Sequence, residues 1–301
     1  MSQISIQSLL DLDRVYPTEN DRENLLFSLR WPNGFICPQC GACKYWPIKK
    51  MFQCASCGYK ASVKSGTIFE HTRKSLKDWF ALCWLVIKDE NGINAKSAAR
   101  LLRFGSYETA WTMLHKLRRA MIAPDEKLSG VVNLDEVFIG SIKYVRKRKF
   151  LKKRAIVLIA VQKDGNNVAK IKLRRIDNPP SPSVINKATV DFINNGSIIQ
   201  TDKYYDEKFT FAGYHHMCIR ESSSIGNNLI PGCEIVAKDI RKWLRKTIRG
   251  GFSVNNLDYY LDEFTFRFNN RNNDRDRLFY KLLEQAVKTE KKTYNNITDK
   301  K

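Results

Sequence analysis

The stretch Val131-Val-Asn-Leu-Asp-Glu-Val-Phe-Ile139 is an apolar run that two adjacent carboxylates interrupt. Its β-branched residues predict a strand, in which Asp135 and Glu136 point to opposite faces of a sheet. A carboxylate in the middle of an apolar strand costs free energy unless something pairs with it. Asp135 is therefore either the partner of a Lys or Arg side chain or a member of a polar site.

The sequence after this run predicts an α/β domain with mixed strand directions. Two more strands follow, then a helix, a strand and further alternating elements, and this order is typical of that class. The domain is predicted over 128–285, and a polar tail over 286–301. Its further strands are predicted over 155–162, 168–176, 197–201 and 216–219, and its helices over 183–194 and 234–248.

A second carboxylate, Asp202, directly follows the strand Ser197-Ile-Ile-Gln-Thr201. Ligand sites in open α/β sheets usually lie at the carboxyl ends of the strands. Two acids that converge there suit a pair of divalent cations, which activate the attacking oxygen and stabilise the leaving oxygen in phosphoryl transfer. The alternative is structural: Asp135 forms an ion pair, and Asp202 caps the turn that follows it.

The last predicted helix offers two candidates for a third acid. Glu234 faces away from the apolar stripe of that helix and shares a face with Lys238, Arg241 and Arg245. An acid for metal beside cations for DNA phosphate suits the edge of an active site. Asp239 lies about 140° around the helix from Glu234 and is the weaker candidate. The alternative role of Glu234 is an interaction with the helix dipole.

The cysteines predict a zinc ribbon over 31–70. Five of the eight fall within 21 positions, and Cys37-Pro-Gln-Cys40 stands thirteen residues before Cys54-Ala-Ser-Cys57. This spacing places four thiolates around one tetrahedral Zn²⁺, and a glycine after each pair suits the knuckle turn. Because Cys40-Gly-Ala-Cys43 is also a valid knuckle, Cys43 stays an alternative ligand. The other cysteines sit in apolar runs and are expected in the core: Cys83, Cys218 and Cys233.

Two helical regions accompany the ribbon, a lead-in over 1–30 and a longer region over 71–125. In the latter, a helix over 75–89 precedes a short helix over 94–102, a turn with glycine and a longer helix over 107–121. The last two are the parts of a helix-turn-helix, although an ordinary helical hairpin fits the pattern equally well.

The longer of these helices has one apolar face and one polar face. His115 is expected to be a half-buried residue of the helix and not a metal ligand. The residues away from the apolar stripe are available to bases or phosphates: Tyr107, Thr109, Thr112 and Lys116.

The charge of the chain favours a polyanionic partner. Its 301 residues include 52 Lys and Arg against 31 Asp and Glu, a net charge of +21. The run 143–154 lies between two predicted strands and is expected to be a flexible loop along DNA phosphates. A solvated loop and a nuclear-localisation signal are the alternatives. The candidate DNA-binding residues are Lys147, Arg148 and Lys149 in this run, and Lys238 and Arg245 in the last helix.

The sequence excludes a membrane protein. No stretch approaches about 18 consecutive apolar residues, and residues 1–6 lack the basic start of a signal peptide. We therefore expect a protein that is not secreted, in the cytoplasm or nucleoid of a prokaryote or in the nucleus of a eukaryote.

Seven ordered segments carry a resemblance that runs from about residue 20 to 280. They are Arg30-Trp-Pro-Asn-Gly-Phe-Ile-Cys-Pro-Gln-Cys40, Phe52-Gln-Cys-Ala-Ser-Cys-Gly58, Ser65-Gly-Thr-Ile-Phe69, Thr109-Ala-Trp-Thr-Met-Leu-His-Lys-Leu-Arg118, Leu134-Asp-Glu-Val-Phe-Ile-Gly140, Gly213-Tyr-His-His216 and Tyr260-Leu-Asp-Glu-Phe-Thr-Phe-Arg-Phe-Asn269. In these segments the chain resembles the insertion-sequence DDE transposases with an N-terminal zinc ribbon, an ISXO-like group related to the eukaryotic Merlin elements.

The resemblance implies a ribonuclease-H-like α/β catalytic domain with a mixed sheet, preceded by a zinc ribbon and a helix-turn-helix-like domain. It also implies chemistry that depends on Mg²⁺ or Mn²⁺: water cuts the 3′ end of the element, and the freed 3′-hydroxyl attacks target DNA. The implied partners are double-stranded DNA, as element ends and target, and further copies of the chain in a homodimer or larger assembly on DNA.

The resemblance assigns roles to four residues. Asp135 and Asp202 fall on the first and second acids of the family and would hold the metals. Glu234 falls on the third acidic position and would complete their shell. Arg241 falls where the family usually carries Lys and would position a phosphate.

The chain also departs from the family. The family often has Ile-Gly-Gly where this chain has Ile139-Gly-Ser141, and the histidine-bearing loop of the relatives is absent around 246–251. Two alternatives therefore stay open. One is a catalytically decayed or repurposed zinc-dependent DNA-binding protein, and the other is a nuclease or recombinase of the same fold that does not transfer strands.

Overall fold

The structure is a computed structural model of the chain and comprises two compact units. Unit 1 consists of Met1–Met121 with Asn272–Lys301, and unit 2 of Ile122–Arg271. The backbone alone is described for 141–144, 150–153 and 220. The described residues are 6–123, 126–144, 150–176, 181–202, 212–220, 230–248, 253–291 and 297.

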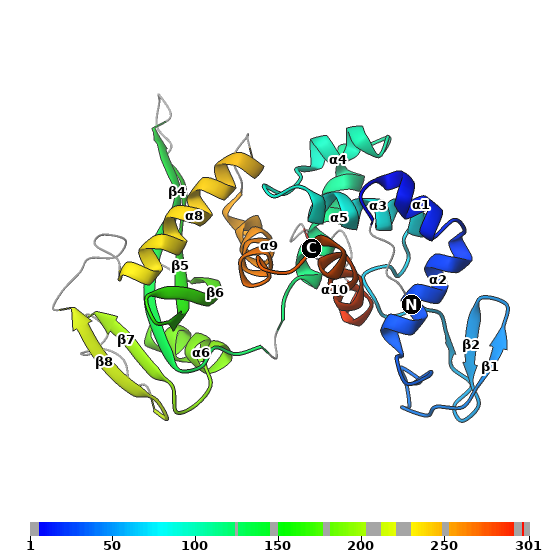
Figure 1. Ribbon diagram of the computed structural model, residues 1–301, viewed down its shortest axis with the longest axis horizontal. Helices are drawn as coiled ribbons and strands as arrows, with labels where there is room; N and C mark the ends of the chain where they lie inside the picture. Colours follow the sequence, from blue (N-terminus) through cyan, green and yellow to red (C-terminus); the bar gives the residue numbers. More distant parts are fainter. Residues whose placement is uncertain are drawn as a thin grey trace. The chain divides into compact units, whose positions relative to one another are not determined.

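Unit 1 is mainly helical (Figure 1), and its helices begin where the sequence supplies capping side chains. A side-chain oxygen of each capping residue accepts the backbone N–H three residues further on, and these residues are Ser8, Thr18, Ser75, Asn94, Ser106 and Asp274. The helices are α1 Leu9–Val15, α2 Glu19–Arg30, α3 Leu76–Lys88, α4 Ala95–Leu101, α5 Tyr107–Ala120 and α10 Arg275–Lys288.

Helix α10 belongs to unit 1, although residues up to 285 were expected in the α/β domain and 286–301 in a polar tail. Its apolar stripe is buried against α2, α3 and α5, and the ring centroids of Phe279 and Phe80 lie 6.0 Å apart. The backbone N–H of Ile6 also donates to the Asp276 carboxylate of this helix. The expected boundary is wrong because an amphipathic helix is buried by any apolar partner, and its period does not indicate which one.

The zinc-ribbon part of unit 1 is a small antiparallel sheet of β1 Tyr45–Ile48, β2 Met51–Cys54 and β3 Lys60–Ala61. Its inner face packs on α2, and the ring centroids of the packed aromatic residues lie 4.9 to 5.8 Å apart. The ribbon core therefore includes a helix of the expected lead-in. The aromatic residues of this core are Phe27, Trp31, Phe35, Tyr45 and Phe52.

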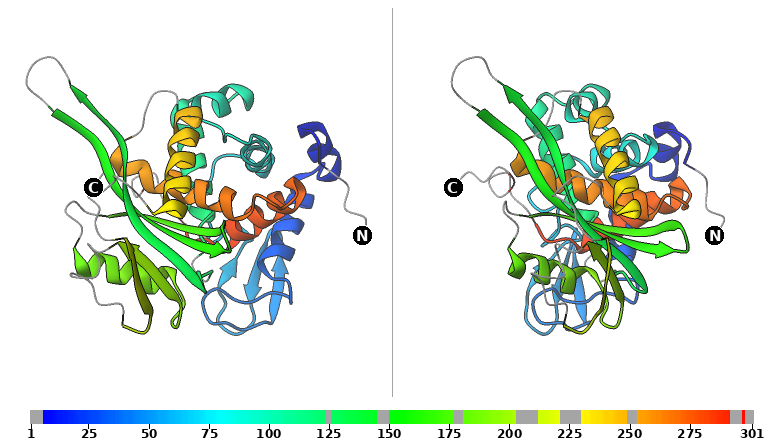
Figure 2. Two further views of the ribbon diagram at one scale, coloured as in Figure 1. Left: turned by 60° about the vertical axis from the view of Figure 1, so that its left-hand side comes forward. Right: turned by 90° about the vertical axis from the view of Figure 1, so that its left-hand side faces the viewer.

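Unit 2 confirms the predicted mixed α/β architecture. Its sheet has the order β6-β5-β4-β7-β8, with β4, β5 and β6 antiparallel and β7 and β8 parallel to β4. Helix α6 lies on one face of this sheet, and α8 and α9 lie on the other (Figure 2). The strands are β4 Val131–Tyr144, β5 Phe150–Asp164, β6 Asn167–Ile176, β7 Ile198–Asp202 and β8 His215–Arg220, and the helices are α6 Pro182–Phe192, α8 Pro231–Thr247, the 3₁₀ helix η1 Val254–Asn256 and α9 Leu257–Asn269.

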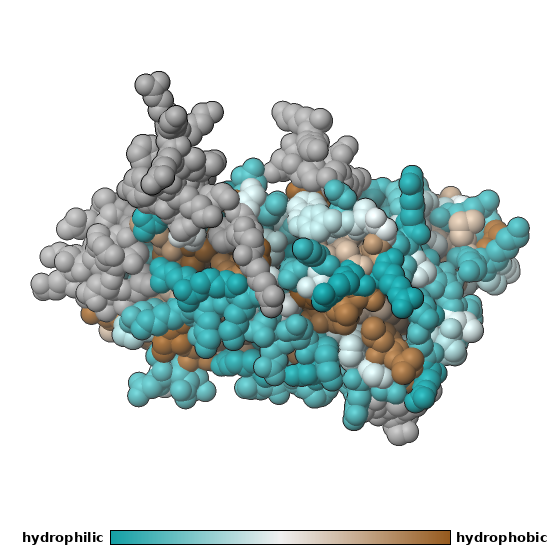
Figure 3. All heavy atoms as spheres, turned by 90° about the horizontal axis from the view of Figure 1, so that it is seen from above, coloured by the Kyte–Doolittle hydropathy of each residue, from teal (hydrophilic) through white to brown (hydrophobic). Residues whose placement is uncertain are grey.

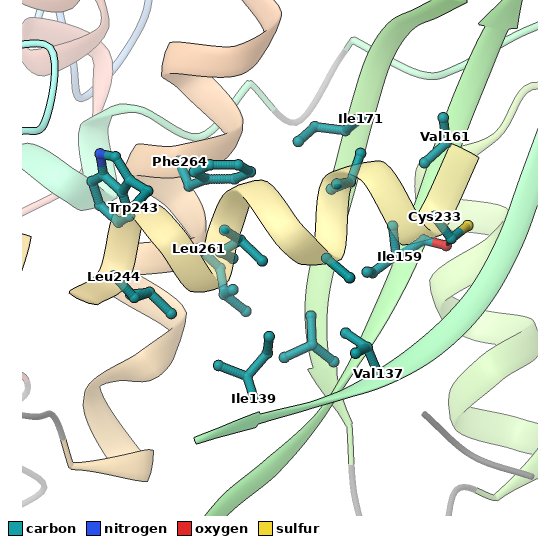
Figure 4. Close-up of a cluster of buried hydrophobic side chains, with 14 of the residues drawn as sticks. Val137, Ile139, Ile159, Val161, Ile171, Cys233, Trp243, Leu244, Leu261 and Phe264 are labelled. Atoms are coloured by element: carbon teal, nitrogen blue, oxygen red, sulfur yellow. Dashed lines mark hydrogen bonds between the residues drawn. The ribbon is translucent and has the colours of Figure 1, made fainter. Parts of the chain in front are cut away.

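Two apolar cores follow from the alternation of side chains along β4 and β5. Val137 and Ile139 point toward α8, and Cys233 near the start of that helix lies beside Ile159 and Val161 (Figure 4). Residues of the opposite parity, such as Leu134, pack on α6. Both faces of the central strands β4 and β5 are therefore buried over much of their length, and a polar side chain there is enclosed within the unit.

The run 143–154 was expected to be a flexible loop, and this expectation is wrong for most of its length. The strands β4 and β5 continue into it from either side, with a register that reaches Tyr144 opposite Phe150. Backbone pairing in an antiparallel ladder does not depend on side-chain charge, so a basic sequence can still extend a hairpin. Three candidate DNA-binding residues, Lys147, Arg148 and Lys149, lie outside the described residues.

The surface in Figure 3 shows mostly hydrophilic side chains where residues are described, with smaller hydrophobic areas between them. Within the described ranges, no helix combines the length and the apolar composition that crossing a bilayer requires.

Candidate functional site

The four predicted zinc ligands come together in two knuckles with the same backbone pattern. The N–H of Gly41 donates to the Cys37 carbonyl, and the N–H of Gly58 donates to the Cys54 carbonyl, at 2.9 and 3.0 Å. Both glycines have a positive φ, of 75° and 72°, which a side chain would strain. The knuckles therefore follow from Cys-x-x-Cys-Gly, a pattern that the chain contains twice.

The sulfur atoms fit a zinc ion. The Sγ atoms of Cys37, Cys40, Cys54 and Cys57 all lie within 4.8 Å of one another, and the two closest pairs are 3.6 and 3.7 Å apart. Tetrahedral thiolates at about 2.3 Å from zinc are about 3.8 Å from each other. The backbone N–H of Cys57 donates toward the Cys54 sulfur and lowers the pKa of that thiol to about 6. The lowered pKa favours the thiolate of Cys54, and the thiolate is the form that binds metal.

The remaining cysteines do not join this cluster. Cys43 is exposed, with its Sγ 4.0 Å from the Gly41 carbonyl, so the alternative that included it is wrong. Cys83 and Cys233 are buried as expected, and burial raises the pKa of both thiols. Cys218 is exposed, contrary to expectation, because it lies on β8 at the edge of the sheet.

Asp135 occupies the centre of the second candidate site, at the start of helix α8. Its side chain is buried, and its two oxygens accept the backbone N–H groups of Glu136 and Ile230, each at 2.8 Å. Ile230 is the N-cap residue of α8, so the positive end of the helix dipole points at this carboxylate. These contacts stabilise the charged form of Asp135.

Asp202 lies on the same face of the sheet as Asp135. Strands β4 and β7 are parallel, with Val132 opposite Ile199 and Asn133 opposite Gln200. Asp135 and Asp202 each lie two residues after a member of the last pair, so alternation along the strands puts both on the same face. Both carboxylates are 4% exposed. The two acids selected from the sequence are thus buried on neighbouring strands of the same sheet.

Glu136 is a third buried acid of this region, and it was not selected as a site residue from the sequence. Burial, together with the charges of Asp135 and Asp202, raises its pKa to about 8. Its side chain belongs to the other face of β4, yet it lies within electrostatic reach of both acids. The position of Glu136 next to Asp135 was the feature of the sequence that could have indicated it. Alternation along the strand, however, puts the two side chains on opposite faces and argued against a shared site.

The structure does not bring the third predicted acid, Glu234, into a tight carboxylate group. Glu234 lies in the first turn of α8, and its side chain is 48% exposed and forms an ion pair with Lys238 at 2.8 Å. Asp239 is also exposed on this helix. Within the described residues, only the four cysteines form a group of three or more ligands with metal-binding spacing.

Three arginines, Arg154, Arg241 and Arg245, lie close to one another beside Phe138 of β4. The guanidinium of Arg154 lies 3.7 Å from the ring centroid of Phe138, and Arg241 donates to the Phe138 carbonyl at 3.2 Å. Burial lowers the pKa of Arg241, and the charges of Arg154 and Arg245 lower it further. Phe138 is three residues from Asp135, about 10 Å along a strand. A row of positive charge therefore lies near the two acids.

The helix-turn-helix-like pair of unit 1 differs in part from expectation. Tyr107 is exposed at the start of α5, but Lys116 is half-buried and donates to the Ile68 carbonyl at 3.4 Å. His115 is fully buried and not half-buried, and burial lowers its pKa to about 2, with Arg118 the next cause. Lys116 is therefore held by its own unit. Thr109 and Thr112 are both partly exposed.

Comparison with known proteins gives matches in both parts of the chain. A family model described as the transposase zinc-ribbon domain matches residues 17–60, and one described as the ISXO2-like transposase domain matches residues 127–269. The second match contains the two acids and the three arginines. No solved structure matches the chain.

A curated relative is a Halobacterium salinarum protein described as an uncharacterized protein in transposable element ISH50. It is 29% identical over 131 residues, which are 42% of this chain and 44% of that protein. The similarity thus spans less than half of the relative.

Proposed function

Because this chain belongs to a transposase family, with that family's zinc-ribbon and ISXO2-like domains in order, we propose that it binds the ends of its own element, cuts there and joins the freed 3′-hydroxyl to target DNA. The observation that carries the proposal is that Asp135 and Asp202 are both buried on one face of the sheet, on the parallel neighbouring strands β4 and β7. Cleavage of a labelled duplex that contains the element end, with Mg²⁺ or Mn²⁺, tests it.

The mixed sheet with helices on both faces supports a ribonuclease-H-like fold for unit 2. In this proposal, Asp135 and Asp202 hold the catalytic cations. Their oxygens are the ligands that Mg²⁺ and Mn²⁺ prefer. The pKa of Glu136 is raised first by burial and then by the charges of Asp135 and Asp202, and a cation would relieve the second cause. When bound, the cations lower the pKa of water and stabilise charge on the reacting phosphate.

The protein's own groups prepare this site. The N–H groups of Glu136 and Ile230 fix the orientation of the Asp135 carboxylate before DNA binds. Arg154, Arg241 and Arg245 provide cations for the phosphodiester strand that leads to the acids. In the same proposal the zinc ribbon is structural, and the protein works on DNA as a homodimer or larger assembly.

We predict that Arg245→Gln and Arg154→Gln each weaken DNA binding uniformly across sequences and reduce the slope of log affinity against log salt by about 1. Each change removes one phosphate-neutralising charge. Binding of a labelled duplex at several salt concentrations measures both effects. Arg14→Gln, at an exposed residue of α1 paired with Asp11, is the matched control and should leave the slope unchanged. If the salt slope were unchanged in both test variants, the DNA would not bind at these arginines.

We further predict that Glu234→Gln abolishes cutting while DNA binding persists, and that Asp239→Asn cuts nearly normally. Glu234 lies in the first turn of α8, the turn that begins at the Asp135 carboxylate, whereas Asp239 is more than a turn further along. A cleavage assay and a binding assay on each variant separate the roles. The reverse pattern of cleavage would make Asp239 the third acid.

The ion pair between Glu234 and Lys238 favours a second candidate function, a DNA-binding protein that no longer cuts. In that case Asp135 and Asp202 remain as a buried pair without catalytic metal. Tight binding of the element end by the wild-type protein, with no cleavage in Mg²⁺ or Mn²⁺, would support this candidate over the active enzyme.

A further inference from the structure

The zinc-ribbon sheet has one packed face and one open face. Tyr45 and Phe52 point inward, toward the aromatic core on α2. The residues between them in the strands point outward, because side chains alternate along a strand. We call this second set the ribbon's outer face, and it consists of Trp46, Ile48, Met51, Gln53 and Lys60.

Three residues of the ribbon's outer face form a row across the sheet. Trp46 of β1 pairs with Gln53 of β2, and Gln53 pairs with Lys60 of β3. Neighbouring strands are about 4.8 Å apart, so the row spans about 10 Å from the indole to the lysine. An aromatic ring, an amide and an ammonium group therefore lie side by side on a rigid platform.

The indole of Trp46 is the unusual member of this row. It is 67% exposed, a larger fraction than for any other aromatic residue in the described part of the chain. Met51, its diagonal neighbour on the same face, is 38% exposed. Since exposed aromatic surface costs free energy in water, a cluster of this kind marks an interaction surface.

The charge around this face identifies the class of partner. From Asn24 to Phe69 the sequence contains no Asp or Glu. Its cations include Lys44, Lys49 and Lys60, which are all exposed. Such a surface repels a basic protein partner and attracts a polyanion.

We propose that the ribbon's outer face binds an unpaired base of a DNA strand. The base stacks on Trp46, its edge meets the amide of Gln53, and the neighbouring phosphates meet Lys60 and Lys44. The base must be unpaired because a duplex covers both faces of each internal base, and stacking on an aromatic side chain needs an open face. This proposal rests on the proposed function for one point only, that the polymer bound by this face is DNA.

The test compares two labelled DNAs of the same sequence, a full duplex and a duplex with a central unpaired stretch. Binding of the full-length, zinc-loaded protein is measured by fluorescence anisotropy without divalent cations, so that no cutting occurs. We expect the wild type to prefer the DNA with unpaired bases. Trp46→Ala should weaken that binding by roughly 5- to 100-fold and leave duplex binding nearly unchanged. Trp46→Phe should keep most of the preference.

The matched control is Leu10→Ala. Leu10 is a 70% exposed apolar residue on α1 of the same unit, beside the acidic Asp11, and its loss should change neither affinity. Zinc content and circular dichroism of each variant establish that the ribbon is folded. Lys60→Gln should lower the salt dependence of binding to the DNA with unpaired bases.

Three outcomes would overturn the proposal. Equal affinity of the wild type and Trp46→Ala for the unpaired DNA would exclude stacking at this face. An equal loss of affinity for both DNAs would indicate that the ribbon's outer face binds the backbone of duplex DNA. A change of sedimentation in Trp46→Ala, with DNA binding unaltered, would make it a contact with a second copy. None of these outcomes depends on cleavage, so failure of the proposed catalysis is detected separately.

Discussion

Replacing Asp135 with asparagine should abolish metal-dependent cleavage of the element end. A catalytic cation stabilises the reacting phosphate by several kcal/mol, so the loss of its ligand should slow cleavage on the order of a thousandfold. The change removes one charge and one ligand oxygen from the proposed cation site. DNA binding should persist, because the arginines near Phe138 are untouched. Cleavage of a labelled duplex in Mg²⁺ and in Mn²⁺ measures the effect.

The same substitution has a measurable effect on stability. The asparagine side chain has one acceptor oxygen, so it loses the N–H of either Glu136 or Ile230, at a cost of roughly 1 kcal/mol or more. Divalent cations should raise the melting temperature of the wild type and not that of the variant. Asp164→Asn, at an exposed strand end of the same sheet, is the matched control. If Asp135→Asn cleaved DNA at the wild-type rate, the catalytic site could not be the one proposed in unit 2.

Replacing Cys37 or Cys57 with serine should release zinc and unfold the ribbon while the sheet of unit 2 stays folded. Structural zinc contributes about 10–16 kcal/mol to zinc-finger peptides at neutral pH, which equals or exceeds the total stability of a typical domain. The aromatic core that the ribbon shares with α2 should loosen with it. Zinc analysis and limited proteolysis within 31–70 measure the two effects.

Cys43→Ser is the control for this prediction. Cys43 lies three residues from Cys40 and is exposed, and its sulfur is not part of the four-sulfur cluster. The variant should retain a full complement of zinc. Zinc loss in Cys43→Ser together with zinc retention in Cys37→Ser would reverse the assignment of the first knuckle.

Much of the fold could be predicted because it depends on local patterns. The strand that contains Asp135 and the helix that contains Glu234 follow from apolar periodicity, and their observed bounds lie within a few residues of prediction at most ends. The four zinc ligands follow from spacing, and Cys37 is preferred to Cys43 because it leaves Gly41 in the turn, where the structure has a positive φ. That choice depends on the backbone hydrogen bond that folds the first knuckle back onto Cys37.

What could not be predicted depends on distant partners. The hydrogen bond from Ile230 to Asp135 joins residues 95 positions apart, and no local pattern indicates it. Lys116 has a helical position that suits DNA, but its ammonium group is bound to a carbonyl in another segment. The electrostatic link of Glu136 with Asp202 likewise depends on how two strands pair.

The division of unit 1 into two sequence segments has a consequence for synthesis on the ribosome. Helix α10, which covers the apolar faces of α2 and α3, is translated only after all of unit 2. At about 5–20 residues per second, that delay is roughly 10 to 30 s, during which Phe80 and its neighbours lack their cover. Unit 2 can complete its own core first, since its segment is continuous. A chain that stops before residue 275 would therefore hold a closed sheet domain and an open, aggregation-prone zinc-ribbon unit.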